Sequence, residues 1–161
     1  MKIYHGSLEI IKCPEIRVSN RTLDYGTGFY TTTNREQAED WVMRRKSQAN
    51  EKVGFINVYE IDLNAIRNSN CLWFDSANEE WVDFVYKNRN DRSFLHDYDF
   101  VYGPVANDRV YAAFTLYESG LLNKAELIKE LKTYTLIDQL LFHTECSLKA
   151  LTFVEAIKIE S

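Results

Sequence analysis

Hydrophobic and polar residues alternate in several short segments, and this period of two predicts β-strands towards both ends of the chain. Residues 2–5 form the first such segment, which ends at Gly6. Residues 53–63 alternate over a longer stretch with apolar side chains on both faces, which predicts a largely buried strand. Further strands are predicted at residues 98–105, 133–144 and 152–159.

Between these segments the apolar residues recur at the helical period instead. The clearest case is residues 34–48, where Asn34 is a suitable N-cap and Gln37 stands at the capping-box position. One face of this predicted helix carries Ala38, Trp41, Val42 and Arg45. Further helices are predicted at residues 78–89, 110–120, 123–132 and, for one or two turns, 145–151.

Local signals also predict where two of these helices end and begin. Gly120 stands where a C-cap belongs, and Asn123 with Glu126 repeats the capping-box spacing. Strands at both ends with helices between them predict an α+β fold. A chain of 161 residues with only two prolines and six glycines predicts a single domain, residues 1–161, without a disordered linker.

Composition and charge narrow the range of partners. The formal net charge of −5 disfavours a protein that wraps a nucleic-acid backbone, although an active site can still contact one briefly. No segment approaches the roughly 20 apolar residues of a membrane span, and the first residues lack the apolar run of a signal peptide. The three cysteines are far apart and odd in number, which indicates a reducing compartment. We therefore expect a cytoplasmic protein without a membrane partner.

The cysteines and histidines show no spacing typical of metal ligands, so no zinc site is predicted. A Cys–His hydrolase stays open, because such partners need not be close in the sequence. No glycine-rich phosphate-binding pattern of the Walker or Rossmann type is present in the sequence.

Three short motifs carry the candidate chemistry. They read YHGS at residues 4–7, DYGTGFYTT at residues 24–32 and DQLLFHT at residues 138–144. In this order they resemble the ADP-ribosyltransferase superfamily, in the branch of diphtheria toxin and the poly(ADP-ribose) polymerases, and its small bacterial members in particular. The resemblance covers the two ends of the chain. It implies a split, mixed β-sheet core that binds NAD as co-substrate, with residues 73–132 as a helical insertion.

The resemblance also implies roles for single residues in NAD binding. The backbone of Gly6 would hold the nicotinamide amide, and His5 would hydrogen-bond the adenosine ribose. Tyr30 would stack on the nicotinamide ring, because the glycines before it, Gly28 included, let the loop approach closely. The other candidates for NAD binding are Ser7, Arg17, Arg21, Gln37 and Trp41. Trp41 would cover the second face of the ring, and a guanidinium would pair with the pyrophosphate.

The sequence departs from the superfamily at the catalytic position. A glutamate normally opens the late strand, and Gln139 stands there instead. A neutral amide can hold a ribose hydroxyl but supplies no charge, so elongation into a polymer is disfavoured. The predicted catalytic set is His5, Tyr30 and Gln139. Glu145 is predicted to be a first-turn helix acid. Asn107 and Asp108 are candidates for the acceptor side of the site, or caps of the next helix.

Each candidate also has a purely structural interpretation. His5 could end a strand with its ring satisfied by backbone, Tyr30 could be a half-buried strand aromatic, and Trp41 could pack in the core. The remaining interpretations are a turn cap for Ser7, a solvated charge for Arg21 and an edge-strand surface position for Gln139.

Together these patterns predict an NAD-dependent mono-ADP-ribosyltransferase. The resemblance adds a role as a toxin or phage-defence effector, with a cognate antitoxin protein as partner. Two alternatives stay open: a non-catalytic NAD-binding module, and an NAD glycohydrolase that uses water as acceptor. The acceptor itself, whether protein, nucleic acid or small molecule, is not visible in the sequence.

Overall fold

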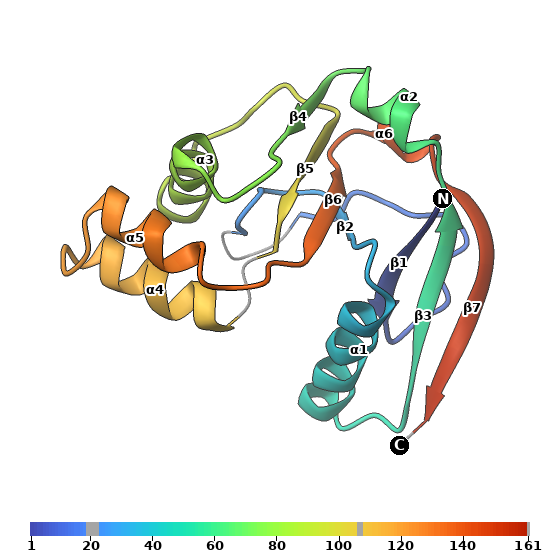
Figure 1. Ribbon diagram of the computed structural model, residues 1–161. Coiled ribbons are helices and arrows are strands. Elements are labelled where there is room, and N and C mark those ends of the chain that lie inside the picture. Colours follow the sequence, from blue (N-terminus) through green and yellow to red (C-terminus); the bar gives the residue numbers. More distant parts are fainter. Residues whose placement is uncertain (19–22, 106–107, 161) are drawn as a thin grey trace.

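Two β-sheets form the centre of the computed structural model, which describes residues 1–18, 23–105 and 108–160 (Figure 1). The first sheet is antiparallel throughout and has the strand order β1-β3-β7. Its strands are β1 (Lys2–Ser7), β3 (Val53–Glu60) and β7 (Thr152–Glu160). The second sheet has the order β2-β6-β5-β4, and only its β4–β5 pair is parallel. Its strands are β2 (Phe29–Thr31), β4 (Cys71–Trp73), β5 (Phe100–Pro104) and β6 (Asp138–Phe142).

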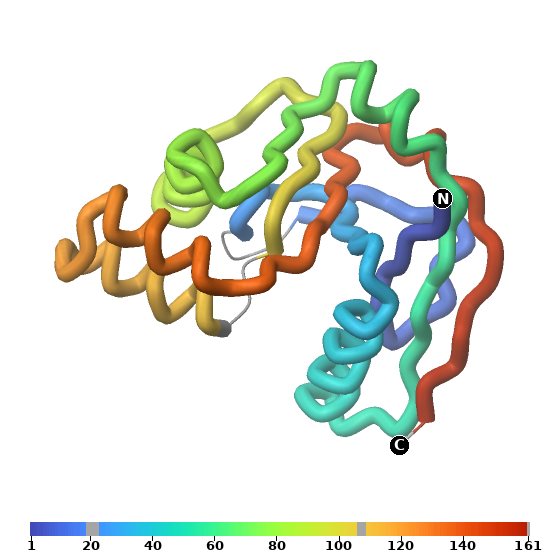
Figure 2. Tube along the Cα trace, viewed as in Figure 1, coloured from blue at the N-terminus to red at the C-terminus, as the bar shows by residue number. Residues whose placement is uncertain are grey.

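Among the described residues, one isolated β-bridge joins the two sheets. The backbone N–H of Tyr4 donates to the carbonyl of Thr32 at 2.9 Å, and Thr32 returns the bond at 3.0 Å. Each sheet combines strands from the first and the last parts of the chain, as the blue and red segments of Figure 2 show. The strands are therefore divided between two sheets, with β1 and β2 at the division, and the predicted α+β class is confirmed.

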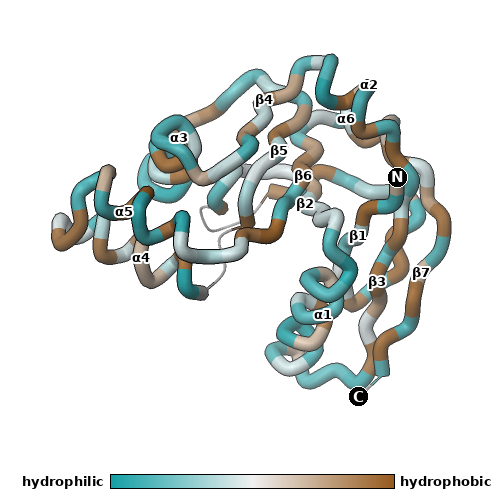
Figure 3. Tube along the Cα trace, viewed as in Figure 1, coloured by the Kyte–Doolittle hydropathy of each residue, from teal (hydrophilic) through white to brown (hydrophobic). Residues whose placement is uncertain are grey.

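Helix α1 (Arg35–Ala49) packs on the first sheet through a narrow buried stripe. The stripe consists of Ala38, Val42 and Lys46, at the i, i+4, i+8 spacing of one helical face. The rest of the helix is largely hydrophilic (Figure 3). The predicted face was wrong in part, because Trp41 is 42% exposed and Arg45 is exposed. Both lie about 100° to one side of the buried stripe.

The predicted caps of the helices are mostly confirmed. The side chain of Asn34 accepts from the backbone of Gln37 at 2.9 Å. Its capping box does not close, however, because the N–H of Asn34 donates to the hydroxyl of Thr32 instead. The box of Asn123 with Glu126 is complete.

The remaining helices lie around the second sheet. They are α2 (Leu63–Arg67), α3 (Glu79–Asn90), α4 (Asp108–Glu118), α5 (Lys124–Leu131) and α6 (Glu145–Leu148). A buried cluster that includes Trp81, Phe114 and Leu127 joins α3, α4 and α5 to Leu141 of β6. Gly120 follows α4 with a φ of 84°, as its predicted C-cap role requires.

Residues 73–132 are not a purely helical insertion. They contain β5, which pairs with β6 on one side and with β4 on the other. Two predicted strands are also shorter than expected. The segment 53–63 ends at Glu60 because Asp62 caps α2, and the segment 133–144 narrows to Asp138–Phe142. Within the described ranges, no helix is long and apolar enough to cross a membrane.

Candidate functional site

Gly6 lies at the open edge of β1, where the two sheets separate. The N–H and C=O of Tyr4 bond Thr32 and so point away from β3, whereas the carbonyl of Met1 accepts from Ile61 on the β3 side. Backbone polar groups alternate in direction along a strand, so the N–H and C=O of Gly6 point the same way as those of Tyr4. They are therefore directed away from β3, on the side of β1 where Tyr4 forms its bridge with Thr32, the residue after β2.

The indole of Trp41 stands next to this edge. A Cβ atom on Gly6 would lie 3.3 Å from Cδ1 of Trp41 and 2.5 Å from the carbonyl oxygen of Ala38. Only glycine lets β1 pass this close to α1, and the same contact places a 42% exposed aromatic ring beside the buried Gly6. The structure thus brings together two of the predicted NAD-binding residues.

His5 is held against β2. Its Nδ1 lies 2.6 Å from the carbonyl oxygen of Tyr30, and its ring stacks on Phe29 with a centroid separation of 4.3 Å. Burial lowers the pKa of His5 and the charge of Arg17 lowers it further, against the opposing effect of the hydrogen bond. The ring is therefore neutral near pH 7. Since a carbonyl only accepts, Nδ1 carries the proton and Nε2 offers a lone pair.

Tyr30 anchors the loop in front of it. Its hydroxyl donates to the carbonyl of Gly26 at 2.7 Å and accepts from the backbone N–H of Tyr25 at 3.3 Å. Gly26 has a φ of 83°, which a residue with a side chain rarely adopts. A Cβ on Gly28 would lie 2.9 Å from Nδ1 of His143. Both glycines thus have structural reasons that do not involve a ligand.

Two histidines also contact the loop of residues 24–28 through its backbone carbonyls. Nδ1 of His143 lies 2.7 Å from the carbonyl oxygen of Thr27, and Nε2 of His96 lies 3.4 Å from that of Tyr25. The two rings meet edge to face with centroids 4.4 Å apart. Burial lowers the pKa of His96, and burial followed by the neighbouring His96 lowers that of His143 to about 4. The pair is uncharged in the folded protein near neutral pH.

The free energy of unfolding is expected to fall as the pH drops from about 6.5 to 4. The folded protein keeps His143 neutral down to about pH 4, whereas an unfolded histidine takes up its proton near pH 6.5. A decrease of roughly 1–2 kcal/mol between pH 7 and 5 follows from about 1.4 kcal/mol per pKa unit. Urea titrations at both pH values measure it. His143→Gln should flatten the dependence, and an equal slope in that variant would contradict the assignment.

Gln139 belongs to a buried polar network on the second sheet. It is 8% exposed and lies on β6, an interior strand, so the edge-strand interpretation was wrong. Its Nε2 donates to the carbonyl of Pro104 at 3.4 Å. The hydroxyl of Tyr25 donates to the same carbonyl at 2.8 Å and accepts from Nε1 of Trp81 at 2.6 Å. The amide of Gln139 and the hydroxyl of Tyr25 therefore share one acceptor, and Tyr25 belongs to the loop of residues 24–28 that contains Gly26 and Gly28.

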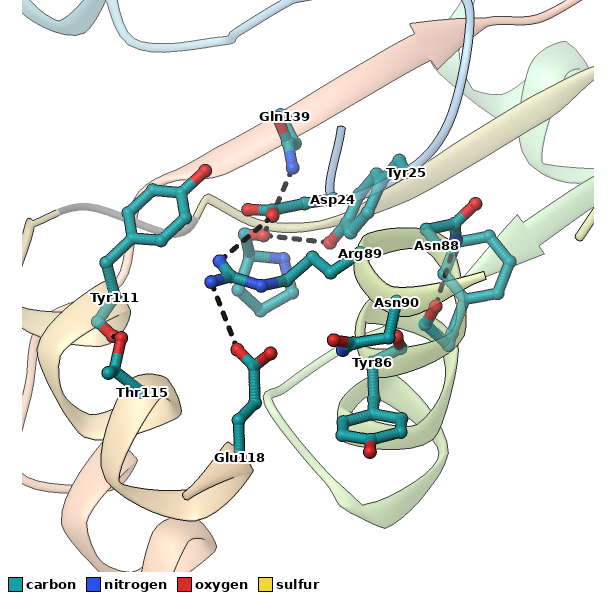
Figure 4. A network of polar contacts seen from close by, with 12 residues as sticks. Asp24, Tyr25, Tyr86, Asn88, Arg89, Asn90, Tyr111, Thr115, Glu118 and Gln139 are labelled. Carbon is teal, nitrogen blue, oxygen red and sulfur yellow. Dashed lines mark hydrogen bonds and ion pairs between the residues drawn. The ribbon is translucent and has the colours of Figure 1, made fainter. Parts of the chain in front are cut away.

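An ion-pair cluster lies beside this network and was missed in the sequence (Figure 4). The guanidinium of Arg89 lies 3.5 Å from Asp24 and 3.1 Å from Glu118, and its side chain is 19% exposed. Burial raises the pKa of Asp24, against the opposing effects of Arg89 and of a hydrogen bond from Tyr111. Figure 4 shows Gln139 and Tyr25 next to the Asp24 end of the cluster. No spacing rule connects positions 24, 89 and 118.

The other sequence candidates are more dispersed. Ser7 accepts from the backbone N–H of Glu9, as a turn cap does, and Arg17 is 72% exposed beside Glu9 and Glu15. Glu145 is in the first turn of α6, as predicted. Arg21 and Asn107 lie outside the described residues, and the structure describes Asp108 only as the first residue of α4.

Comparison with known proteins gives one family. A family model described as protein of unknown function (DUF3990) matches residues 1–153. No curated protein and no solved structure gave a match.

Proposed function

This chain belongs to the DUF3990 family of proteins of unknown function, and we propose that it is an NAD-dependent mono-ADP-ribosyltransferase. One observation carries the proposal. The backbone N–H and C=O of Gly6 are directed away from β3, the exposed ring of Trp41 lies beside this buried glycine, and the neighbouring His5 contacts Tyr30 of β2. These are the residue types that an NAD-cleaving enzyme needs, brought together from β1, β2 and α1.

In this proposal the N–H and C=O of Gly6 bind the carboxamide of nicotinamide, which offers one acceptor and one donor. The indole of Trp41 stacks on the nicotinamide ring. Nε2 of His5 accepts from a ribose hydroxyl, since its Nδ1 proton is used by Tyr30. Tyr30 contributes by holding the loop in place, because its hydroxyl is bound to Gly26.

The reaction breaks the bond between C1′ of the ribose and the nicotinamide nitrogen, which keeps the electron pair. A nucleophile of the acceptor donates its own electron pair to C1′ and loses a proton to solvent. The role of the protein is to orient NAD and to stabilise the positive charge that develops on the ribose. Gln139 contributes a hydrogen bond to a ribose hydroxyl but no charge.

The second candidate is a non-catalytic NAD-binding module. It is favoured by Gln139, whose amide is already bound to Pro104 in the buried network. Incubation with NAD separates the candidates: an enzyme releases nicotinamide, whereas a module binds NAD and releases none. A glycohydrolase would release nicotinamide without labelling any macromolecule. A cytoplasmic location and an antitoxin partner belong to the same proposal and rest on the family resemblance.

His5→Ala is expected to lower the rate of nicotinamide release at least tenfold. The variant removes the acceptor for the ribose hydroxyl and also the donor to the Tyr30 carbonyl, which costs about 1–2 kcal/mol of stability. Rates should therefore be compared well below both melting temperatures. The matched control is Ser7→Ala, two residues along β1, whose hydroxyl only caps a turn. A rate in His5→Ala equal to that of wild type would remove His5 from the site.

A further inference from the structure

A groove of about 760 Å³ lies next to the proposed site. Its walls are α5, the residues before and at the start of α3, and the end of the β5–β6 pair. It comes close to Gln139, because Pro104 of the neighbouring strand β5 and Asp138 of β6 line it. Pro104 accepts the amide of Gln139, and Asp138 directly precedes it.

The groove has an apolar floor and a charged rim. The apolar part includes Phe74, Leu131 and Leu136. The carboxylates of Asp75, Glu79 and Asp138 line the side of the sheet and α3, whereas Lys129 and Lys132 line the side of α5. The carboxylates and the ammonium groups therefore line opposite sides of the rim, and Asp138 of the acidic side directly precedes Gln139 in β6.

The three carboxylates differ in how far they are already used. Asp138 accepts from the hydroxyls of Thr33 and Tyr102, and Asp75 accepts from Nε1 of Trp73 at 2.8 Å. Glu79 is exposed, and its carboxylate interacts electrostatically with Lys124, whose closer partner is Asp83 at 2.8 Å. Glu79 is therefore the acid of the groove that is available to a cation from a partner.

We propose that the groove docks the acceptor of the transfer reaction, and that this acceptor is a protein segment with apolar side chains and a basic residue. The proposal rests on the proposed function. An apolar floor with a polar rim is the usual anatomy of a protein interface. The basic residue pairs with Glu79, at the acidic side that adjoins Gln139. A nucleic acid is disfavoured, because the acidic side and the net charge of −5 repel its phosphates.

The test compares Glu79→Lys with Glu80→Lys. Both residues are in the first turn of α3, so both reversals change the charge and the helix-dipole interaction alike. Only Glu79 lines the groove, since Glu80 lies on a separate surface with Phe84 and Phe94. Two quantities are measured with labelled NAD. The first is free nicotinamide, and the second is label on macromolecules of a lysate, which is digested with nuclease or protease after the reaction to identify the labelled material. We expect Glu79→Lys to lower protein labelling at least tenfold. Nicotinamide release without lysate, where water takes the place of the protein acceptor at C1′, should stay within twofold of wild type, and Glu80→Lys should change neither quantity.

Two further probes define the occupant. A synthetic peptide of alternating leucine and arginine should inhibit protein labelling, and one of alternating leucine and glutamate should not. Ala125→Trp, at an exposed position of α5 that lines the groove, should reduce labelling by filling it. Leu121→Trp, at a 73% exposed position outside the groove, is its control.

Equal labelling by the two lysine variants would overturn the groove as the acceptor site, and label on nuclease-sensitive material would overturn the protein acceptor. Absence of nicotinamide release from wild type would overturn the proposed function itself. In that case the fluorescence anisotropy of the labelled leucine–arginine peptide still tests the groove. Equal affinity for wild type and Glu79→Lys would then reject it as well.

Discussion

Trp41→Ala is expected to weaken NAD binding by about tenfold to a hundredfold, because an aromatic ring stacked on a base contributes about 1–3 kcal/mol. The fold should change little. Trp41 is 42% exposed and lies outside the buried stripe of α1, so its removal leaves Ala38, Val42 and Lys46 in place. Calorimetric titration with NAD measures the affinity, and thermal unfolding measures the stability.

Two variants serve as controls for this result. Met43→Ala removes a side chain that is 44% exposed on the same helix but points about 200° away from Trp41, so NAD affinity should be unchanged. Trp41→Phe keeps a flat ring and should retain most of the affinity. Equal affinity of wild type and Trp41→Ala would place the nicotinamide elsewhere. No binding to wild type at all would overturn the NAD proposal.

Gln139→Glu is expected to raise nicotinamide release by about a hundredfold. A preorganised charge near a developing opposite charge is commonly worth about 10²–10³ in rate. The hydroxyl of Tyr25 lies within hydrogen-bonding range of the Gln139 side chain, and it can donate to the new carboxylate in place of the carbonyl of Pro104. Because burial raises the pKa of a carboxyl group, the gain should grow with pH as the glutamate ionises.

Gln139→Met is the matched comparison, because it keeps the volume and removes the amide. It should lower nicotinamide release severalfold, as expected for the loss of one hydrogen bond of about 0.5–1.5 kcal/mol. The carbonyl of Pro104 still receives the Tyr25 hydroxyl, so the fold should persist. Equal and measurable rates in wild type, Gln139→Glu and Gln139→Met would remove Gln139 from the site. Zero release from wild type with a gain in Gln139→Glu would support the non-catalytic module.

The candidate site was predictable only in part. The sequence pointed to His5, Gly6, Tyr30 and Trp41, and the structure shows two contacts among them, Gly6 with Trp41 and His5 with the carbonyl of Tyr30. The reason given for the glycines was incomplete. Gly6 is also needed because β1 passes close to Ala38 of α1, a contact between segments about thirty residues apart that no motif shows.

Features that depend on neighbours in the sequence were determined by the sequence alone. The caps at Asn34 and Asn123 and the turn at Gly120 arise from bonds that span about three residues. The alternation of apolar residues likewise predicted β3, β5, β6 and β7 and with them the α+β class.

The tertiary structure alone decided which distant residues meet. Arg89 forms ion pairs with Asp24 and Glu118. His96 and His143 contact each other and the backbone carbonyls of residues 25 and 27. Both clusters form because helices and strands far apart in the chain pack together. The exposure of Trp41 and the burial of Gln139 likewise follow from which face of α1 meets the first sheet and from the place of β6 between β2 and β5. Burial and partners set pKa values and accessibility, and neither is encoded in the spacing of residues along the chain.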